Sequence, residues 1–378
     1  MSFLKKIFSP KDAPILTNKD FWDWFLVHEK TFYKVVKSND KIDKNFFNKI
    51  GPKLDQLNEG YFYLTGMAEE NTAELVLTAE GRVKNIVFVE ELVKAAPIIE
   101  GWLFTALKPA LEKEDASITM SGYEFSINKI HFYANNDNTT PDEIEITVVH
   151  PDYNEENKEE ITNGVFVFLD NFLGELNFTL KLDLLNVVGE NDAEAELIPM
   201  TKLKDFLIWR EKEFVEKYDG IRHDTENDNY SMLQAELESG KMVFSLINTD
   251  LLSWDAKASH PWILCIELKF DGSKNNGMPD DKTFKLLDEI EAAIMKQLKD
   301  SDGYLNVGRE TSDGIREIFF ACREFRKPSL VISQIENEYK DKVEISFEIY
   351  KDKYWKMFDR FIGVEDADVE DDDEEDEE

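Results

Sequence analysis

The sequence predicts an α+β protein of two domains, each an antiparallel sheet packed by helices, followed by a disordered acidic tail. Three observations lead to this prediction. Residues 261–351 show strand and helix patterns in the order βαββαβ. An aromatic-rich helical pattern begins at Lys19 and again at Lys204, and either a duplication or a coincidence between two amphipathic helices explains it. Residues 364–378 carry 12 acidic side chains and no basic one, and such a segment cannot pack into a core.

The first domain is predicted over residues 17–188, after a flexible N-terminus of residues 1–16 and before a linker of residues 189–200. Helices are expected where apolar residues recur every three or four positions, and strands where they alternate. On this basis the helices cover residues 19–33, 46–57, 89–95 and 158–173. The strands cover residues 61–67, 73–78, 102–106, 117–120, 127–133, 144–149 and 178–188. Gly51-Pro52 is expected to kink or split the second helix.

The second domain is predicted over residues 201–362, with a ferredoxin-like core at residues 261–351. Asp280 or Asp281 can cap the first core helix, and Ser312-Asp313-Gly314 is typical of a tight hairpin. A helix at 202–218 and a hairpin at 230–248 precede core strands at 262–270, 304–309, 317–322 and 343–349 and core helices at 280–298 and 328–339. Strands and helices in this order form the split βαβ arrangement. Both faces of the sheet are apolar, so the pattern leaves open which face the helices cover.

Three short motifs in this block are distinctive. His260-Pro261-Trp262 enters the first core strand, Gly277-Met278-Pro279-Asp280 precedes the first core helix, and Gly308-Arg309 with Thr311 precedes the hairpin turn. Through these motifs residues 229–351 resemble the domain-of-unknown-function family six-ninety-five, which is found in bacterial proteins. Members of that family are sometimes fused to domains similar to the regulator of ribonuclease activity B, a protein-binding inhibitor. The sequence holds no separate domain of that type, and its first half resembles no family that we can name.

The charge of the chain limits its partners. The formal net charge is −35, and residues 1–363 still carry −23 of it. Such a field repels nucleic acid, whose binding depends on Lys and Arg, and it disfavours anionic membrane surfaces. A basic protein, a cation or a neutral ligand remain as partners. The sequence has no apolar run of about 18 residues, no signal peptide and no myristoylation site, so we expect a cytoplasmic protein without a membrane span.

Motifs for metal, cofactor or covalent chemistry are absent from the sequence. The five histidines show no short metal-ligand spacing, and residues 224–235 lack the glycine and the final acid of a calcium loop. We find no phosphate-binding loop and no nucleophile elbow. Cys265 and Cys322 lie in expected strands with their side chains on opposite faces, so we expect structural thiols rather than a disulfide or a nucleophile. The sequence therefore predicts no catalytic residue, no metal and no cofactor.

The best candidate site is a group of four residues near strand ends or loops: His260, Asp280, Arg309 and Thr311. Simple structural roles are the alternative, since Asp280 can cap a helix, Arg309 can pair with a glutamate, and His260 precedes a proline. The leading hypothesis for function is a non-enzymatic protein-interaction or regulatory module whose acidic surface binds a basic protein. The competing hypothesis is an enzyme or small-ligand binder with a site where the domains meet, and a third is an assembly component. A deep pocket with converging polar groups would favour the second hypothesis.

Overall fold

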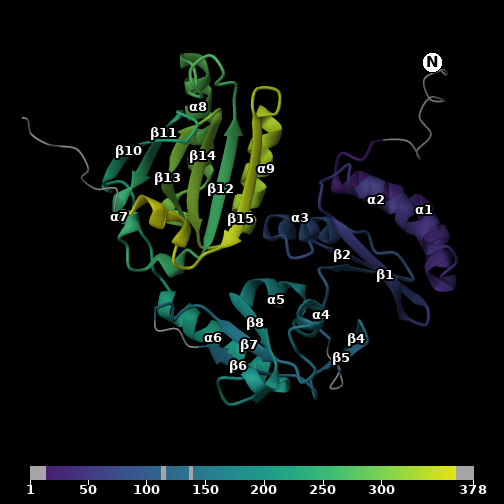
Figure 1. Ribbon diagram of the computed structural model, residues 1–378. Helices are drawn as coiled ribbons and strands as arrows, with labels where there is room; N and C mark the ends of the chain where they lie inside the picture. Colours follow the sequence, from purple (N-terminus) through teal and green to yellow (C-terminus); the bar gives the residue numbers. More distant parts are fainter. Residues whose placement is uncertain (1–13, 112–115, 136–138, 363–378) are drawn as a thin grey trace, which may run out of the picture. The chain divides into compact units, whose positions relative to one another are not determined.

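The computed structural model describes residues 14–111, 116–135 and 139–362 (Figure 1). The described residues form two compact units, which divide between Lys217 and Tyr218. The prediction of a mixed α+β protein is confirmed. The predicted acidic tail, and the predicted flexible N-terminus up to residue 13, lie outside the described residues.

Helices and strands are interspersed along the first unit. Its helices are α1 (Asn18–Ser38), α2 (Asn48–Leu54), α3 (Val83–Lys94), α4 (Lys158–Leu173), α5 (Glu175–Lys181) and α6 (Leu203–Tyr218). Its strands are β1 (Phe62–Glu69), β2 (Thr72–Thr78), β3 (Trp102–Ala106), β4 (Ser117–Met120), β5 (Tyr123–Ser126), β6 (His131–Asn135), β7 (Glu145–Val149), β8 (Leu184–Val188) and β9 (Ile198–Pro199). They form the sheets β1-β2-β3, β4-β5 and β8-β7-β6-β9.

The expectation of purely antiparallel sheets is wrong for the first unit. Strands β2 and β3 pair in parallel, and so do β7 and β8. In each pair the chain crosses from one strand to the next through helices, α3 in the first case and α4 with α5 in the second. A helical crossover returns the chain to the same end of the sheet, so the two strands run in the same direction.

Two predicted strands of the first unit are wrong because buried apolar residues there do not lie on a continuous strand. The expected strand 127–133 begins as a turn after Ser126 and becomes a strand only at His131, where β6 begins. Ile127 and Ile130 are both buried in this turn region. The expected strand 178–188 begins as helix α5, from which Phe178 packs on the core, and becomes strand only at β8. Gly51-Pro52 does not split the second helix, because α2 continues through both residues after a π-helical turn at Asp43–Phe47.

Helix α6 packs in the first unit, although its sequence position placed it at the start of the second domain. Its residues Leu203 and Leu207 are buried in the same cluster as Phe132 and Phe168. Part of the expected linker is also structured, since Ile198 in β9 pairs with Phe132 in β6. The units therefore divide between Lys217 and Tyr218.

A buried carboxylate joins distant segments of the first unit. Glu175, at the start of α5, has no exposed surface. It accepts hydrogen bonds from the Thr78 hydroxyl at 2.6 Å and from the backbone N–H groups of Ala79 at 3.1 Å, Gly81 at 3.2 Å and Lys108 at 3.0 Å. The loops that follow β2 and β3 are thereby held on α5. Hydrogen bonds to a carboxylate are stronger than those between neutral groups. The four bonds to Glu175 therefore stabilise the packing of these two loops against α5.

The second unit is built on one six-stranded sheet of order β10-β11-β13-β14-β12-β15, with every neighbouring pair antiparallel. Its strands are β10 (Tyr230–Glu236), β11 (Met242–Asn248), β12 (Trp262–Lys269), β13 (Tyr304–Ser312), β14 (Ile315–Cys322) and β15 (Glu344–Lys351). Its helices are α7 (Thr249–Leu252), α8 (Asp281–Gln297) and α9 (Arg326–Tyr339), with a 3-10 segment η7 at Lys356–Phe361. The predicted strands, hairpins and helices of this unit are confirmed, with ends shifted by a few residues.

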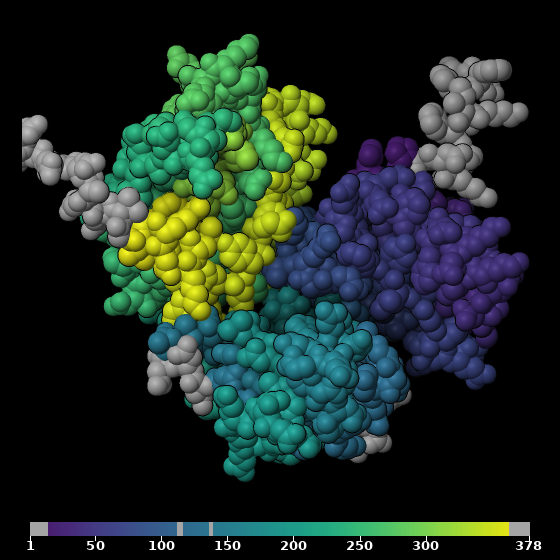
Figure 2. All heavy atoms as spheres, viewed as in Figure 1, coloured from purple at the N-terminus to yellow at the C-terminus, as the bar shows by residue number. Residues whose placement is uncertain are grey.

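Both faces of this sheet are covered, which answers the question that the sequence left open. Leu264, Ile266 and Leu268 are fully buried on the face that carries α8 and α9. On the opposite face, Ile263 and Phe319 belong to a core cluster with side chains of α7 and η7. In the space-filling view the last described residues, in yellow, lie across this face (Figure 2).

Candidate functional site

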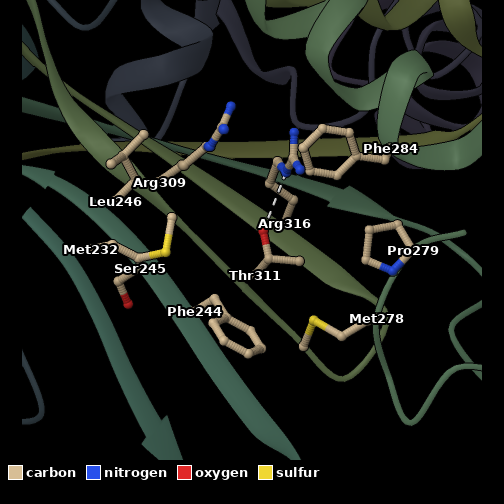
Figure 3. A pocket seen from close by; sticks show the side chains of 10 residues that line it. All are labelled: Met232, Phe244, Ser245, Leu246, Met278, Pro279, Phe284, Arg309, Thr311 and Arg316. Atoms are coloured by element: carbon tan, nitrogen blue, oxygen red, sulfur yellow. Dashed lines mark hydrogen bonds between the residues drawn. The ribbon is translucent and has the colours of Figure 1, made fainter. Parts of the chain in front are cut away.

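A pocket of about 310 Å³ lies in the second unit, on the sheet face that carries α8 (Figure 3). Its apolar walls come from three places: two neighbouring strands, the loop before α8, and the first turn of α8. These wall residues are Met232 of β10, Phe244 and Leu246 of β11, Met278 and Pro279 of the loop, and Phe284 of α8. The strand residues share one face because Met232 pairs with Leu246, and Phe244 pairs with Thr311.

The loop wall of the pocket is held in place by a close backbone contact. Gly277 has a φ of +88°, and its carbonyl accepts a hydrogen bond from the Gly314 N–H at 2.8 Å. A Cβ atom at this position would lie 3.0 Å from backbone atoms of Asp313. Only glycine suits both the conformation and the approach. The Gly277-Met278-Pro279 motif therefore fixes Met278 and Pro279 beside the β13–β14 hairpin.

The polar part of the pocket is centred on Arg316 of β14, whose side chain is almost completely buried. Its Nε donates to the Thr311 hydroxyl at 3.2 Å, and its Nη1 donates to Asp288 of α8 at 2.7 Å (Figure 3 shows the first of these bonds). The guanidinium also lies over the ring of Phe284, 5.0 Å from its centroid. Burial lowers the pKa of Arg316, and the hydrogen bond to Asp288 opposes that effect.

Arg309 of β13 shares the same acids. Its Nη1 donates to Glu291 at 2.6 Å and to Asp288 at 3.3 Å. Two guanidiniums thus face two carboxylates, and the formal charges balance. Among the described residues neither the Nη2 of Arg316 nor the Nε and Nη2 of Arg309 has an acceptor, and none of these atoms is among the fully buried ones, so they are open to solvent or to a ligand.

The structure brings three of the four predicted site residues to one region. Arg309 and Thr311 line the pocket. Asp280 lies next to Pro279 but acts as the N-cap of α8, where its carboxylate accepts from the Thr283 N–H at 2.8 Å. That hydrogen bond lowers the pKa of Asp280.

His260 does not belong to this site. His260 lies before the start of β12, and Asp280 lies after its end. The strand has eight residues, so its two ends are roughly 25 Å apart. His260 is fully buried, with Nδ1 2.8 Å from the Ser259 hydroxyl and its ring against Trp254. Burial, together with the positive charge of Arg222, lowers its pKa to about 4, so this histidine is neutral at physiological pH.

Sequence reasoning missed the central residue of the pocket, although a signal was present. Arg316 alternates with Ile318 and Phe320, which are fully buried, so it interrupts an otherwise apolar strand face. A charged residue on a buried strand face is rare unless it is paired with an opposite charge. Arg316 therefore predicts a buried ion pair on this face. No sequence pattern indicated that Met232 and Phe284 would line the pocket, because their positions there depend on how β10 and α8 pack on the sheet.

The described ranges show neither a metal site nor a membrane-spanning helix. No group of three or more His, Cys, Asp or Glu side chains there is arranged to hold a metal ion. None of the helices in the same ranges has the length and apolar character that crossing a bilayer requires. Cys265 and Cys322 are both free thiols.

The second unit is thus a six-stranded α+β module with an apolar pocket over a buried arginine. Residues 228–362, nearly all of this unit as described, match a protein family described as a family of unknown function, DUF695. The resemblance seen in the sequence motifs is confirmed, and the first half of the chain has no family match. No curated protein and no solved structure matches the chain.

Proposed function

We propose that this protein is a non-enzymatic binding module, and that its second unit binds its ligand in the pocket over Arg316. The observation that carries the proposal is where the family motifs lie: Gly277-Met278-Pro279-Asp280 supplies Met278 and Pro279, and Gly308-Arg309 with Thr311 supplies Arg309 and Thr311. The cavity volume is at the lower end of the range for small-ligand sites. Arginine stays protonated in proteins and cannot act as a general base, so this lining suits recognition better than acid–base catalysis.

We also propose that the second unit contains a ferredoxin-like core. The strand order β13-β14-β12-β15, with α8 between β12 and β13 and α9 between β14 and β15, supports a ferredoxin-like core. Strands β10 and β11 would then be an N-terminal hairpin added at one edge, and this addition creates the pocket. The free thiols of Cys265 and Cys322 are in keeping with a cytoplasmic location.

The proposal can be tested with a neutral apolar probe, 1-octanol, and methyl NMR of protein labelled at the methionine methyl groups. We expect octanol to shift the resonances of Met232 and Met278, which line the pocket. The methyl of Met295, which is exposed on the same helix as Phe284, should stay in place. Leu246→Trp should fill the cavity and weaken binding at least about tenfold, because the added ring occupies the volume that the probe needs.

Leu330→Trp is the matched control for this test, since Leu330 is 40% exposed on α9 and does not line the pocket. We expect this variant to bind octanol as the unchanged protein does. The proposal fails if octanol moves neither pocket methyl, or if both tryptophan variants bind equally well.

A basic protein partner is the second candidate, and a row of acids on the other sheet face favours it. Ser245, Glu310, Glu317, Glu267 and Ser346 lie directly opposite one another across five strands. Like charges in such positions repel, and burial raises the pKa of Glu317, although a hydrogen bond from Cys265 opposes this. Arg360 of η7 already lies 3.6 Å from Glu310, and a cationic partner would relieve the repulsion that remains between Glu317 and Glu267.

Affinity capture at low and moderate salt tests this second candidate. We expect one basic protein to be retained by the full-length chain and by a chain ending at Gly363. Replacing Glu267, Glu310 and Glu317 together by glutamine should abolish retention. Retention by the full-length chain alone would assign binding to the tail, and no retention by any form would end the hypothesis of a basic partner.

A further inference from the structure

The pocket over Arg316 has unused hydrogen-bond donors at one end and apolar walls elsewhere. The Nη2 group of Arg316 and the Nε and Nη2 groups of Arg309 find no acceptor among the described residues. Asp288 and Glu291 contact only the Nη1 groups of the two arginines, so these unused N–H groups of both guanidiniums are open to the acceptor atoms of a ligand. A buried guanidinium gains most when each of its edges is hydrogen-bonded.

The walls define the rest of the occupant. Phe244, Leu246, Met278 and Phe284 are apolar, and the two methionines, Met232 and Met278, adapt to different shapes. Met232 is 75% exposed, so the β10 side of the pocket opens to solvent. A ligand can therefore enter over β10 with its polar end toward Arg316 and its apolar body against β11 and α8.

We propose that this pocket binds a small carboxylate with an apolar body. Its carboxylate oxygens accept hydrogen bonds from Nη2 of Arg316 and from Nε and Nη2 of Arg309. A carboxylate matches the planar fork of a guanidinium and forms paired hydrogen bonds with it, which a hydroxyl or an ammonium group does not. The inference rests on the proposed function, since it names the chemical class of ligand for the same pocket. It also explains why an acidic protein keeps two arginines beside an apolar cavity.

The test compares four probes of equal chain length at neutral pH: octanoate, octanamide, 1-octanol and octylamine. Binding is followed by the Met232 and Met278 methyl resonances and by calorimetry. We expect octanoate to bind at least about tenfold more tightly than octanol and octanamide, since hydrogen bonds to a charged group are worth more than neutral ones. Octylamine, which is cationic, should bind most weakly of the four.

Variants separate the arginines from the apolar walls. Arg316→Met gives a side chain of similar reach without the donors, so the ratio of octanoate affinity to octanol affinity should fall from about tenfold to about one. Arg309→Gln makes the same test at a side chain that is 25% exposed, where folding is less at risk if the buried variant is unstable. Leu330→Trp again serves as the control.

The outcomes distinguish the two proposals. If octanol shifts the pocket methyls but octanoate binds no more tightly, the carboxylate inference is overturned and the proposed function stands. If no probe binds, both fail. The last probe is a short peptide with a C-terminal leucine and a free carboxylate. If this peptide binds more tightly than octanoate, the assignment of a small-molecule ligand is overturned.

Discussion

Replacing Glu175 by glutamine should lower the free energy of unfolding of the first unit by about 3–5 kcal/mol. The carboxylate accepts four hydrogen bonds from Thr78, Ala79, Gly81 and Lys108, and its residue is fully buried. A glutamine has one oxygen and one NH₂ group. The NH₂ group would face donors instead of accepting from them, and buried N–H groups would be left without partners.

Hydrogen exchange measured by mass spectrometry on the full chain can localise this effect. We expect Glu175→Gln to increase exchange in β2, in the loops after β2 and β3, and in α5, while the second unit exchanges as before. The melting temperature of the first unit should fall by roughly 10 °C. Glu80→Gln is the control, because Glu80 pairs with Nζ of the same Lys108 at 3.3 Å but is 43% exposed, where an ion pair contributes little. Equal effects of both substitutions would contradict the role given to Glu175.

Local pattern was enough to predict elements whose signal is contained in their own residues. The bounds of β3, β4 and α4 agree with the sequence prediction residue for residue, since each is a short apolar run or a clear helical stripe between polar turns. The prediction failed for α5. This helix begins at Glu175, whose carboxylate accepts a hydrogen bond from Thr78, 97 residues away in the sequence. A local pattern contains no information on such a contact.

The candidate site was predictable to a similar extent. Arg309 and Thr311 were found because they stand in a short distinctive motif, and Asp280 because it begins a helix. His260 was a poor choice that the sequence itself could have corrected, since it and Asp280 flank the same strand. Arg316 stood out as a charged residue in an apolar strand. What the sequence did not contain is the position of β10 and β11 beside β13, which turns these residues into a pocket.

A bulge in β13 explains how Arg309 and Thr311 point their side chains into the pocket. The pairing of β13 with β14 shifts register between Asn306 and Gly308. Without the extra residue, strict alternation would place Arg309 on the opposite face from Asn306. With it, Val307 packs in the core of the other face, and Arg309 faces α8. The bulge therefore aims Arg309 and Thr311 at the pocket.

Gly308 makes this bulge possible, and Gly308→Ala should destabilise the second unit by about 3–5 kcal/mol. Its φ is +148°, and a Cβ atom would lie 2.3 Å from the carbonyl oxygen of Leu246 and 2.9 Å from Cα of Ile247. These are backbone atoms of the neighbouring strand, so relief requires β11 and β13 to separate. The same movement would open the pocket wall at Leu246 and displace Arg309.

The measurement is thermal unfolding of the full chain together with octanol binding at the Met278 methyl group. We expect Gly308→Ala to lower the melting temperature of the second unit and to lose the octanol-induced shift. Gly66→Ala is the matched control, because Gly66 also lies in a strand, β1, yet a Cβ atom there would meet no atom within 4 Å. That substitution should change stability by less than about 1 kcal/mol, and in the stabilising direction. If Gly308→Ala were equally harmless and still bound octanol, the bulge would not be what positions Arg309 and Thr311.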